Sequence, residues 1–166
     1  MNKKRKIANK GFTLIEILVV IGIVAILATI VIIALNPSRQ FAQARNSQRV
    51  SNVNTILNAI GQRVADNKGL LQGAFTIGGT TYTCPTLLAS TLYTITSIAG
   101  ATNIDLSCLT PTYIPLNIPF DPSDKDAKWT SAVDYDTKYQ VIIDANGRYT
   151  VSAPSAELAQ IISVTR

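Results

Sequence analysis

Residues 10–35 read KGFTLIEILVVIGIVAILATIVIIAL and decide the fold, because a glycine is followed at once by a long apolar run. The 24 residues of 12–35 form about 36 Å of α-helix at about 1.5 Å per residue. A bilayer has a hydrocarbon core of about 30 Å, so this helix is long enough to cross it with some tilt. Glu16 is the only ionisable side chain in the run. The sequence therefore predicts one transmembrane helix that contains one acid.

The residues in front of this run form a basic leader that ends in Gly11. Five basic side chains and no acidic one precede Gly11, and they account for the whole formal net charge of +5. By the positive-inside rule the leader stays in the cytoplasm, and the chain from Pro37 onward lies across the membrane. The high pI is therefore a targeting feature and weak evidence for nucleic acid as a partner.

The place of Gly11 separates this leader from an ordinary secretory signal peptide, whose cleavage site lies behind its apolar region. Cleavage after Gly11 would keep the apolar helix in the mature protein. Glycine suits such a site, because a backbone without a side chain can enter a narrow cleft. The alternative is that Gly11 begins the helix of an uncleaved signal anchor.

The order of these features resembles the prepilin signal that type IV pilins share with the pseudopilins of type II secretion and DNA uptake. Gly11, Phe12, Glu16 and the apolar run carry the resemblance, which covers about the first quarter of the chain. It implies that a prepilin peptidase cuts between Gly11 and Phe12 and N-methylates the new Phe12 amine. It also implies an α+β, pilin-like fold, in which a long N-terminal helix packs on a small antiparallel β-sheet head.

Glu16 needs a partner, because a charge near the bilayer centre costs about 2.5–3.5 kcal/mol on insertion scales. It lies about 6 Å along the helix from Phe12. One interpretation is that Glu16 reaches the lipid headgroups or bonds its own amine. The other, which the resemblance favours, is that Glu16 neutralises the Phe12 amine of a neighbouring subunit and fixes the register of a filament. The resemblance further implies an assembly ATPase and a membrane platform protein as partners.

A second helix is predicted over 37–68. Asn36-Pro37 predicts a break before it, because proline removes a helical hydrogen bond and biases the residue before it away from the helix. Apolar residues then recur at steps of three or four and predict a buried face: Val50, Val53, Leu57, Ile60 and Val64. We expect the polar residues of this stretch on the opposite, solvent-facing side: Arg45, Arg49, Asn52, Gln62 and Arg63.

The chain thus divides into a leader over 1–11, a membrane or filament-core helix over 12–36, an amphipathic helix over 37–68 and a β-rich head over 69–166. Two hairpins are predicted in the head, one around Gly78-Gly79 and one around a type I′ turn at Asn146-Gly147. A terminal strand is expected within 158–164. Residues 85–98 form either a short helix or irregular turns.

Cys84 and Cys108 are the only cysteines, and both fall in the part predicted to be translocated, where a disulfide can form. A bond between them would close a loop and stabilise the fold by about 3 kcal/mol in the chain-entropy model. The alternative is two buried free thiols.

Asp121, Asp124 and Asp126 cluster in a proline-bent stretch just before Trp129. Such carboxylates are hard oxygen ligands of the kind that Ca²⁺ prefers. The resemblance points the same way, because major pseudopilins carry a calcium loop after a similar Pro-x-Asp-Pro stretch. The alternative is a solvated acidic turn, which the spacing favours because it is not that of an EF-hand.

Catalysis has little support in this sequence. The chain contains no histidine, which excludes His-based triads, His-ligated zinc and histidine general bases. No phosphate-binding glycine loop is present either. We therefore expect a protein that is not an enzyme, without catalytic residues and without a required cofactor.

Charge is distributed unevenly along the chain. Residues 37–68 carry five bases and one acid, whereas residues 69–166 carry five bases and eight acids. Three interpretations are open: a solvated helix face, pairing of basic helices with acidic heads of neighbouring subunits, and capture of DNA by a surface fibre. The third is the weakest, because the arginines lack interleaved aromatic side chains on which bases would stack.

The sequence therefore predicts a structural subunit of a type IV pilus-like filament. The precursor would be a single-pass protein of the cytoplasmic membrane, and the polymer an extracellular pilus. Two alternatives stay open. One is a type II secretion pseudopilin, which forms a periplasmic pseudopilus; the other is a signal-anchored binding module that never polymerises.

Overall fold

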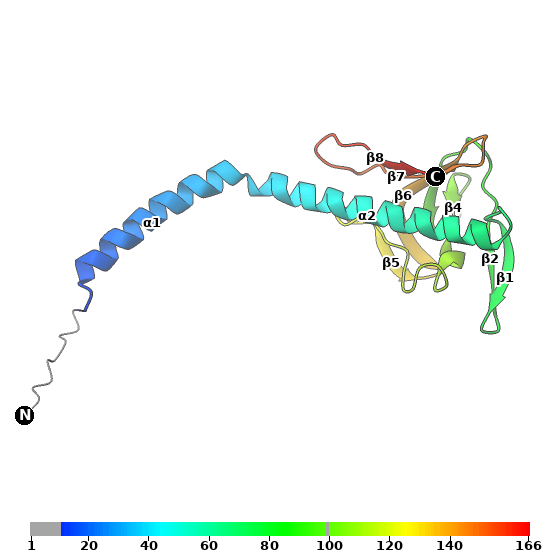
Figure 1. Ribbon diagram of the computed structural model, residues 1–166, viewed down its shortest axis with the longest axis horizontal. Coiled ribbons are helices and arrows are strands. Elements are labelled where there is room, and N and C mark those ends of the chain that lie inside the picture. The colour runs from blue at the N-terminus through cyan, green and yellow to red at the C-terminus, as the bar shows by residue number, and fades with distance from the viewer. Residues whose placement is uncertain (1–10, 99) are drawn as a thin grey trace, which may run out of the picture. The chain divides into compact units, whose positions relative to one another are not determined.

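The computed structural model describes residues 11–98 and 100–166, so most of the predicted leader lies outside the described residues. Within these ranges the chain forms two α-helices, α1 (Leu14–Leu35) and α2 (Pro37–Asp66), followed by eight strands (Figure 1). It divides after Gln40 into two compact units, and the second unit, Phe41–Arg166, holds most of α2 and every described strand. The predicted α+β class is confirmed, and the second helix belongs with the head.

Helix α1 ends where the sequence predicted a break. Asn36 adopts a left-handed conformation with φ 41° and ψ 77°, and Pro37 opens α2. Proline is well placed there, because the first residue of a helix needs no hydrogen-bonded N–H. The Asn36 side chain accepts hydrogen bonds from Ser38 Oγ at 2.7 Å and from the Arg39 backbone N–H at 3.3 Å. These contacts start the second helix directly behind the first.

The head is built around one mixed sheet in the order β4-β3-β6-β7-β8, and β5 pairs with β6. Its pairings are antiparallel except for the parallel pair β3–β4. Strands β1 and β2 form a separate antiparallel hairpin. The strands are β1 (Gly73–Ile77), β2 (Thr80–Cys84), β3 (Tyr93–Thr96), β4 (Asn103–Ile104), β5 (Lys128–Ser131), β6 (Asp134–Ile143), β7 (Tyr149–Ala153) and β8 (Ile162–Thr165).

The core lies between α2 and the sheet. Val53, Ile56 and Ile60 of α2 are fully buried in one cluster with Tyr139 and Val141 of β6 and other strand residues. Two parts of the predicted helix pattern are wrong. Val50 is 44% exposed, and Arg49 and Arg63, which we expected on the solvent side, are buried. The buried stripe passes through Asn46, Arg49, Val53, Ile56, Ile60 and Arg63.

Both predicted hairpins are present, but the turn of the second one differs from the prediction. Only Gly147 takes a left-handed φ in that turn, at 83°, whereas a type I′ turn needs positive φ at Asn146 as well. The Asp144 carboxylate instead accepts hydrogen bonds from the backbone N–H groups of Asn146 and Arg148. The turn is therefore held by an aspartate that precedes it in the sequence.

The disulfide between Cys84 and Cys108 is present, with the two Cα atoms 5.3 Å apart. It joins the end of β2 to the 3₁₀ turn η1 (Ser107–Leu109). The hairpin β1–β2 thus has a covalent link to the segment beneath it. The prediction for residues 85–98 is wrong, because β3 lies within this range and pairs with β6 in the middle of the sheet.

Candidate functional site

The predicted cleavage position lies in exposed, non-helical chain just before α1. Gly11, Phe12 and Thr13 precede the first helical residue, and Phe12 is 84% exposed. A peptidase needs an accessible and extended backbone, which a helix does not offer, since its backbone groups are hydrogen-bonded to each other. The peptide bond between Gly11 and Phe12 therefore lies in the local structure that cleavage requires.

Glu16 is hydrogen-bonded within its own helix. Its Oε2 atom accepts hydrogen bonds from the Thr13 backbone N–H at 2.8 Å and from Thr13 Oγ1 at 2.9 Å. The Glu16 N–H in turn donates to Thr13 Oγ1 at 3.3 Å. This reciprocal arrangement is a capping box, and the Thr-x-x-Glu pattern of the sequence is its signal. In a single chain, the acid therefore has a local partner.

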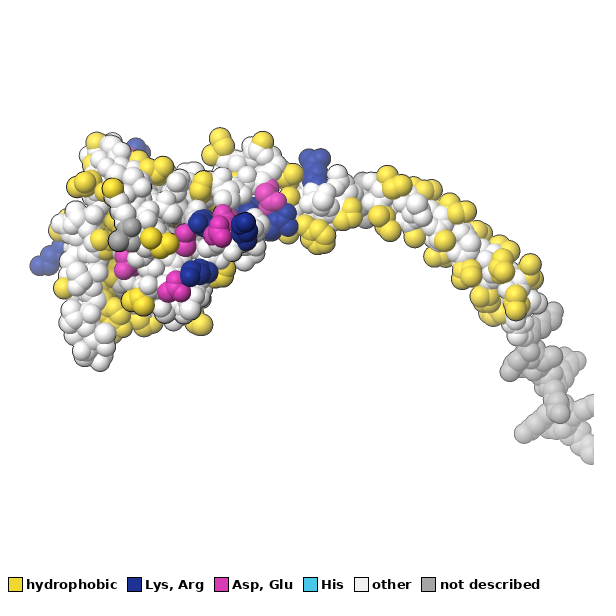
Figure 2. Space-filling view, turned by 180° about the vertical axis from the view of Figure 1, so that it is seen from behind, with side chains coloured by type: hydrophobic (Ala, Val, Ile, Leu, Met, Phe, Trp, Pro, Cys, Tyr) yellow, Lys and Arg dark blue, Asp and Glu magenta, His cyan; other side chains and the backbone are white. Residues whose placement is uncertain are grey.

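The rest of α1 is apolar and uncovered. Leu14–Ile33 is the only helix in the described part of the chain that is long and apolar enough to cross a membrane, with a mean hydropathy of 3.0. Its side chains are exposed throughout, and Figure 2 shows hydrophobic groups along its whole length. A helix that is apolar on all sides is stable only in lipid or among other apolar helices. The first unit thus needs a non-aqueous environment.

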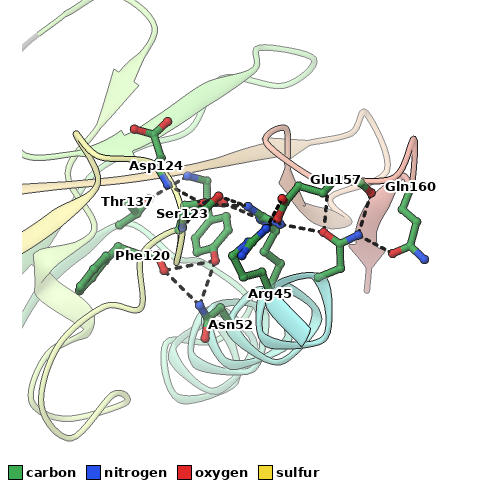
Figure 3. A network of polar contacts seen from close by, with 12 residues as sticks. Arg45, Asn52, Phe120, Ser123, Asp124, Thr137, Glu157 and Gln160 are labelled. Atoms are coloured by element: carbon green, nitrogen blue, oxygen red, sulfur yellow. Dashed lines mark hydrogen bonds and ion pairs between the residues drawn. The ribbon is translucent and has the colours of Figure 1, made fainter. Parts of the chain in front are cut away.

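A second cluster of functional side chains lies where α2 meets the head (Figure 3). Arg49 is completely buried at its centre. Its guanidinium donates to Asp121 Oδ2 at 2.7 Å and Oδ1 at 3.1 Å, to Glu157 Oε2 at 2.9 Å and to Ser123 Oγ at 2.6 Å. It also donates to Asn46 Oδ1 at 2.7 Å, so all five Arg49 N–H groups have a partner, which a buried charge requires. Burial alone would raise the pKa of Asp121, but the hydrogen bonds from Arg49 and two backbone N–H groups outweigh it and lower that pKa.

Glu157, in the loop between β7 and β8, forms the outer half of this cluster. Arg45 donates to both of its carboxylate oxygens, at 2.7 and 2.5 Å. The Asn46 side chain donates to the Glu157 carbonyl oxygen at 2.7 Å and to Gln160 Oε1 at 2.8 Å, and accepts from the Glu157 backbone N–H at 3.0 Å. The hydrogen bonds from Arg45 and then Arg49 lower the pKa of Glu157 to about 2. We call Arg45, Asn46, Arg49, Asp121 and Glu157 the clamp.

The clamp changes the role of Asp121 and the interpretation of the charge asymmetry. Asp121 is ion-paired with Arg49, and in the described ranges no three acidic or cysteine side chains gather where they could hold a metal ion. Calcium binding by Asp121, Asp124 and Asp126 stays a prediction. Basic α2 residues and acidic head residues do pair, but Arg45 and Arg49 pair with carboxylates of their own chain. Two of the five bases in 37–68 are thus already neutralised, which weakens the DNA interpretation further.

Comparison with known proteins gives one match. The family model of the prokaryotic N-terminal methylation motif matches residues 7–32, which include Gly11, Phe12, Thr13 and Glu16. Together with the apolar helix, this motif fits a type IV pilin or pseudopilin signal. The comparisons with curated proteins and with solved structures find no match.

Proposed function

We propose that this chain is a structural subunit that polymerises into a type IV pilus-like filament after prepilin peptidase cleaves between Gly11 and Phe12. One observation carries the proposal: the methylation motif at residues 7–32 extends into α1, whose apolar side chains over Leu14–Ile33 are exposed. The motif fits a structural role of the pilin type. The motif supports processing, and the uncovered helix supports burial among copies of itself.

The mechanism begins in the cytoplasmic membrane, where lipid covers α1. Cleavage creates a positively charged amine on Phe12, which directly precedes Thr13 of the capping box and lies four residues before Glu16. During assembly α1 leaves lipid for a bundle of identical helices, and Glu16 pairs with the Phe12 amine of a neighbouring copy. An ion pair in a medium of low dielectric constant penalises wrong axial registers, which apolar contacts alone tolerate. An assembly ATPase and a membrane platform protein would drive the transfer.

The experiment is to shear cells, collect extracellular polymer and determine the N-terminal residue of the chain by mass spectrometry. Chain that begins at N-methylated Phe12 in the sheared fraction supports the proposed pilus. Processed chain that stays in the envelope supports the type II secretion pseudopilin, which carries the same kind of signal. Chain that still begins at Met1 contradicts both and supports the signal-anchored binding module.

Calcium binding in the head stays a prediction, although the Asp121 carboxylate is occupied by Arg49. Thermal unfolding of the full chain in detergent, with calcium or with a chelator, tests it. A calcium-dependent rise in the unfolding midpoint that Asp126→Asn abolishes would favour the pseudopilin alternative. An unchanged midpoint would remove this argument for it.

A further inference from the structure

A second surface of the head lies beside the clamp along α2. Strand β8 and the loop before it follow α2: Gln160 contacts Asn46 near one end, and Arg166 donates to Asn58 nearer the other. We call the surface made by residues 50–64 of α2 and residues 158–165 the seam. The seam carries an exposed apolar projection at one end and an apolar hollow at the other.

The seam has almost no charge. In both of its segments together, Arg63 is the only charged residue, and its guanidinium is buried and donates to the carbonyl oxygens of Leu71 and Gly73. Soluble proteins are designed with charged side chains on about 25–35% of their surface positions. The cores of protein–protein interfaces, in contrast, are depleted of charge. The composition of the seam is therefore that of an interface.

The projection is Ile161, which is 95% exposed at the end of the loop between β7 and β8. In the same loop, Leu158 and Ala159 have φ values of 58° and 53°, a left-handed conformation that residues with a Cβ rarely adopt. Glu157, immediately before them, is fixed to α2 by the clamp. An unfavourable backbone persists only where its surroundings impose it. The clamp thus fixes the loop that carries the exposed Ile161.

The hollow lies farther along the seam and has a volume of about 210 Å³. It is lined by Leu57, Ile60, Gly61, Val64, Gly147, Tyr149 and Arg166. Gly61 leaves its floor open, because a Cβ built there meets no atom within 4 Å. A cavity of about 150 Å³ is enough for a group the size of benzene. An isoleucine side chain therefore fits in the hollow.

Ile161 cannot fill the hollow of its own chain. Its loop is fixed to Asn46 and Ile161 lies beside Val50, whereas Gly61 is eleven residues farther along α2, about 16 Å at about 1.5 Å per residue. A projection and a hollow at different places on one surface join copies head to tail, and such contacts extend into a filament where the rotation between copies does not close a ring. The projection carries no charge, and the one charged side chain that lines the hollow, Arg166, donates a hydrogen bond to Asn58.

We propose that Ile161 of one copy inserts into the hollow beside Gly61 of the next copy, so that the seam joins the globular heads of neighbouring copies in the assembled polymer. The occupant is a second copy of this chain, because the same chain presents both the projection and a hollow of matching size and polarity. This inference rests on the proposed function, since it requires a polymer.

Disulfide cross-linking of the full-length chain in cells tests the contact. We replace Ile161 and Gly61 by cysteine in one chain, oxidise the sheared polymer mildly and separate it on a non-reducing gel. A disulfide needs Cα atoms about 4.4–6.8 Å apart, so the pair forms between copies and not within one. We expect a ladder of dimers, trimers and longer products. The matched control, Val133→Cys with Gly61→Cys, uses an equally exposed apolar residue outside the seam and should give no ladder.

Truncation of the projection provides a second test that does not depend on cysteine geometry. We expect Ile161→Ala to lower the yield of sheared polymer at least about tenfold, because the hollow of the next copy would stay unfilled. Val133→Ala truncates an exposed apolar residue elsewhere and should leave the yield unchanged. An intact Cys84–Cys108 disulfide in both variants confirms folding.

The outcomes separate this inference from the proposed function. Polymer without a ladder, together with a normal yield from Ile161→Ala, contradicts the seam contact and leaves the proposed function standing. Wild-type chain that is cleaved but never found in polymer contradicts both. A ladder together with the loss of polymer in Ile161→Ala alone supports the contact.

Discussion

At Glu16, one carboxylate oxygen already accepts two hydrogen bonds within the single chain. Oε2 caps α1 through Thr13, and a neighbour's amine would compete with these two hydrogen bonds during assembly. The capping box therefore stabilises the precursor in lipid. The ion pair in the polymer must be more favourable in free energy than the hydrogen bonds that it replaces. A capping box alone needs an acceptor oxygen at this position, whereas charge neutralisation needs a carboxylate.

This difference makes Glu16→Gln and Glu16→Ala a matched pair. Glutamine keeps the acceptor oxygen of the capping box but removes the charge, and alanine removes both. We expect both variants to insert and to be cleaved, and both to lose sheared polymer, if the neighbour's amine is the partner of Glu16. Immunoblots of sheared and membrane fractions measure this. Polymer at the wild-type level in Glu16→Gln would show that only the cap matters.

The solvent-facing position predicted for Arg49 was wrong because the prediction followed its charge. The helical spacing put a residue at position 49 on the same face as Val53, Ile56 and Ile60, but its charge assigned it to solvent. Its partners Asp121 and Glu157 are 72 and 108 residues away in the sequence. One sequence contains no signal that joins such distant positions, so the clamp could not be predicted.

We expect Arg49→Met to destabilise the fold by about 3–5 kcal/mol, because methionine fills the space but leaves Asp121 buried without its cation. Arg148→Met is the matched control: its exposed pair with Asp144 should contribute less than about 1 kcal/mol. Urea unfolding of the full chain in detergent, followed by the fluorescence of Trp129, gives both values. Equal effects of the two substitutions would contradict the structural role of the clamp.

Among the elements, those with local signals were predicted and those that depend on distant partners were not. The two helices follow from hydropathy and from Pro37, and the hairpins from their glycine turns. Strand β3 is only four residues long, and its partner β6 begins 38 residues after it ends. The alternation of Tyr93 and Ile95 is too short to indicate a strand by itself, because the neighbouring residues favour turns. The signal at residues 11–16 was predictable because its residues are contiguous.

The loop between β7 and β8 depends on an acid and should therefore respond to pH. The pKa of Glu157 is about 2 in the folded chain against an ordinary value of 4.5, so its ionised form stabilises the fold above pH 4.5, and this stabilisation is lost as the pH falls from 4.5 to about 2. We expect the unfolding free energy of the wild type to exceed that of Glu157→Gln at pH 7 and the two to converge toward pH 2. A difference that does not depend on pH would contradict the ion pair.

For the whole molecule, the leader charges and the disulfide bond report on the same property, the side of the membrane on which the head folds. The leader before α1 carries five basic residues. Basic residues also follow α1, and the first three of these are Arg39, Arg45 and Arg49. If the leader decides orientation, the head reaches an oxidising compartment, where the bond between Cys84 and Cys108 can form. Without those charges the three arginines favour the reverse orientation, which would leave the head in the reducing cytoplasm.

We therefore expect replacement of the five leader bases by glutamine to leave Cys84 and Cys108 reduced in most of the chain. Acid trapping followed by alkylation with a polymer-coupled maleimide measures this, because each free thiol slows the chain on a gel. The control changes the four leader lysines to arginine, which keeps the charge and should keep the disulfide. If the glutamine variant were still oxidised, α1 itself or the head would set the orientation, and the leader would serve processing alone.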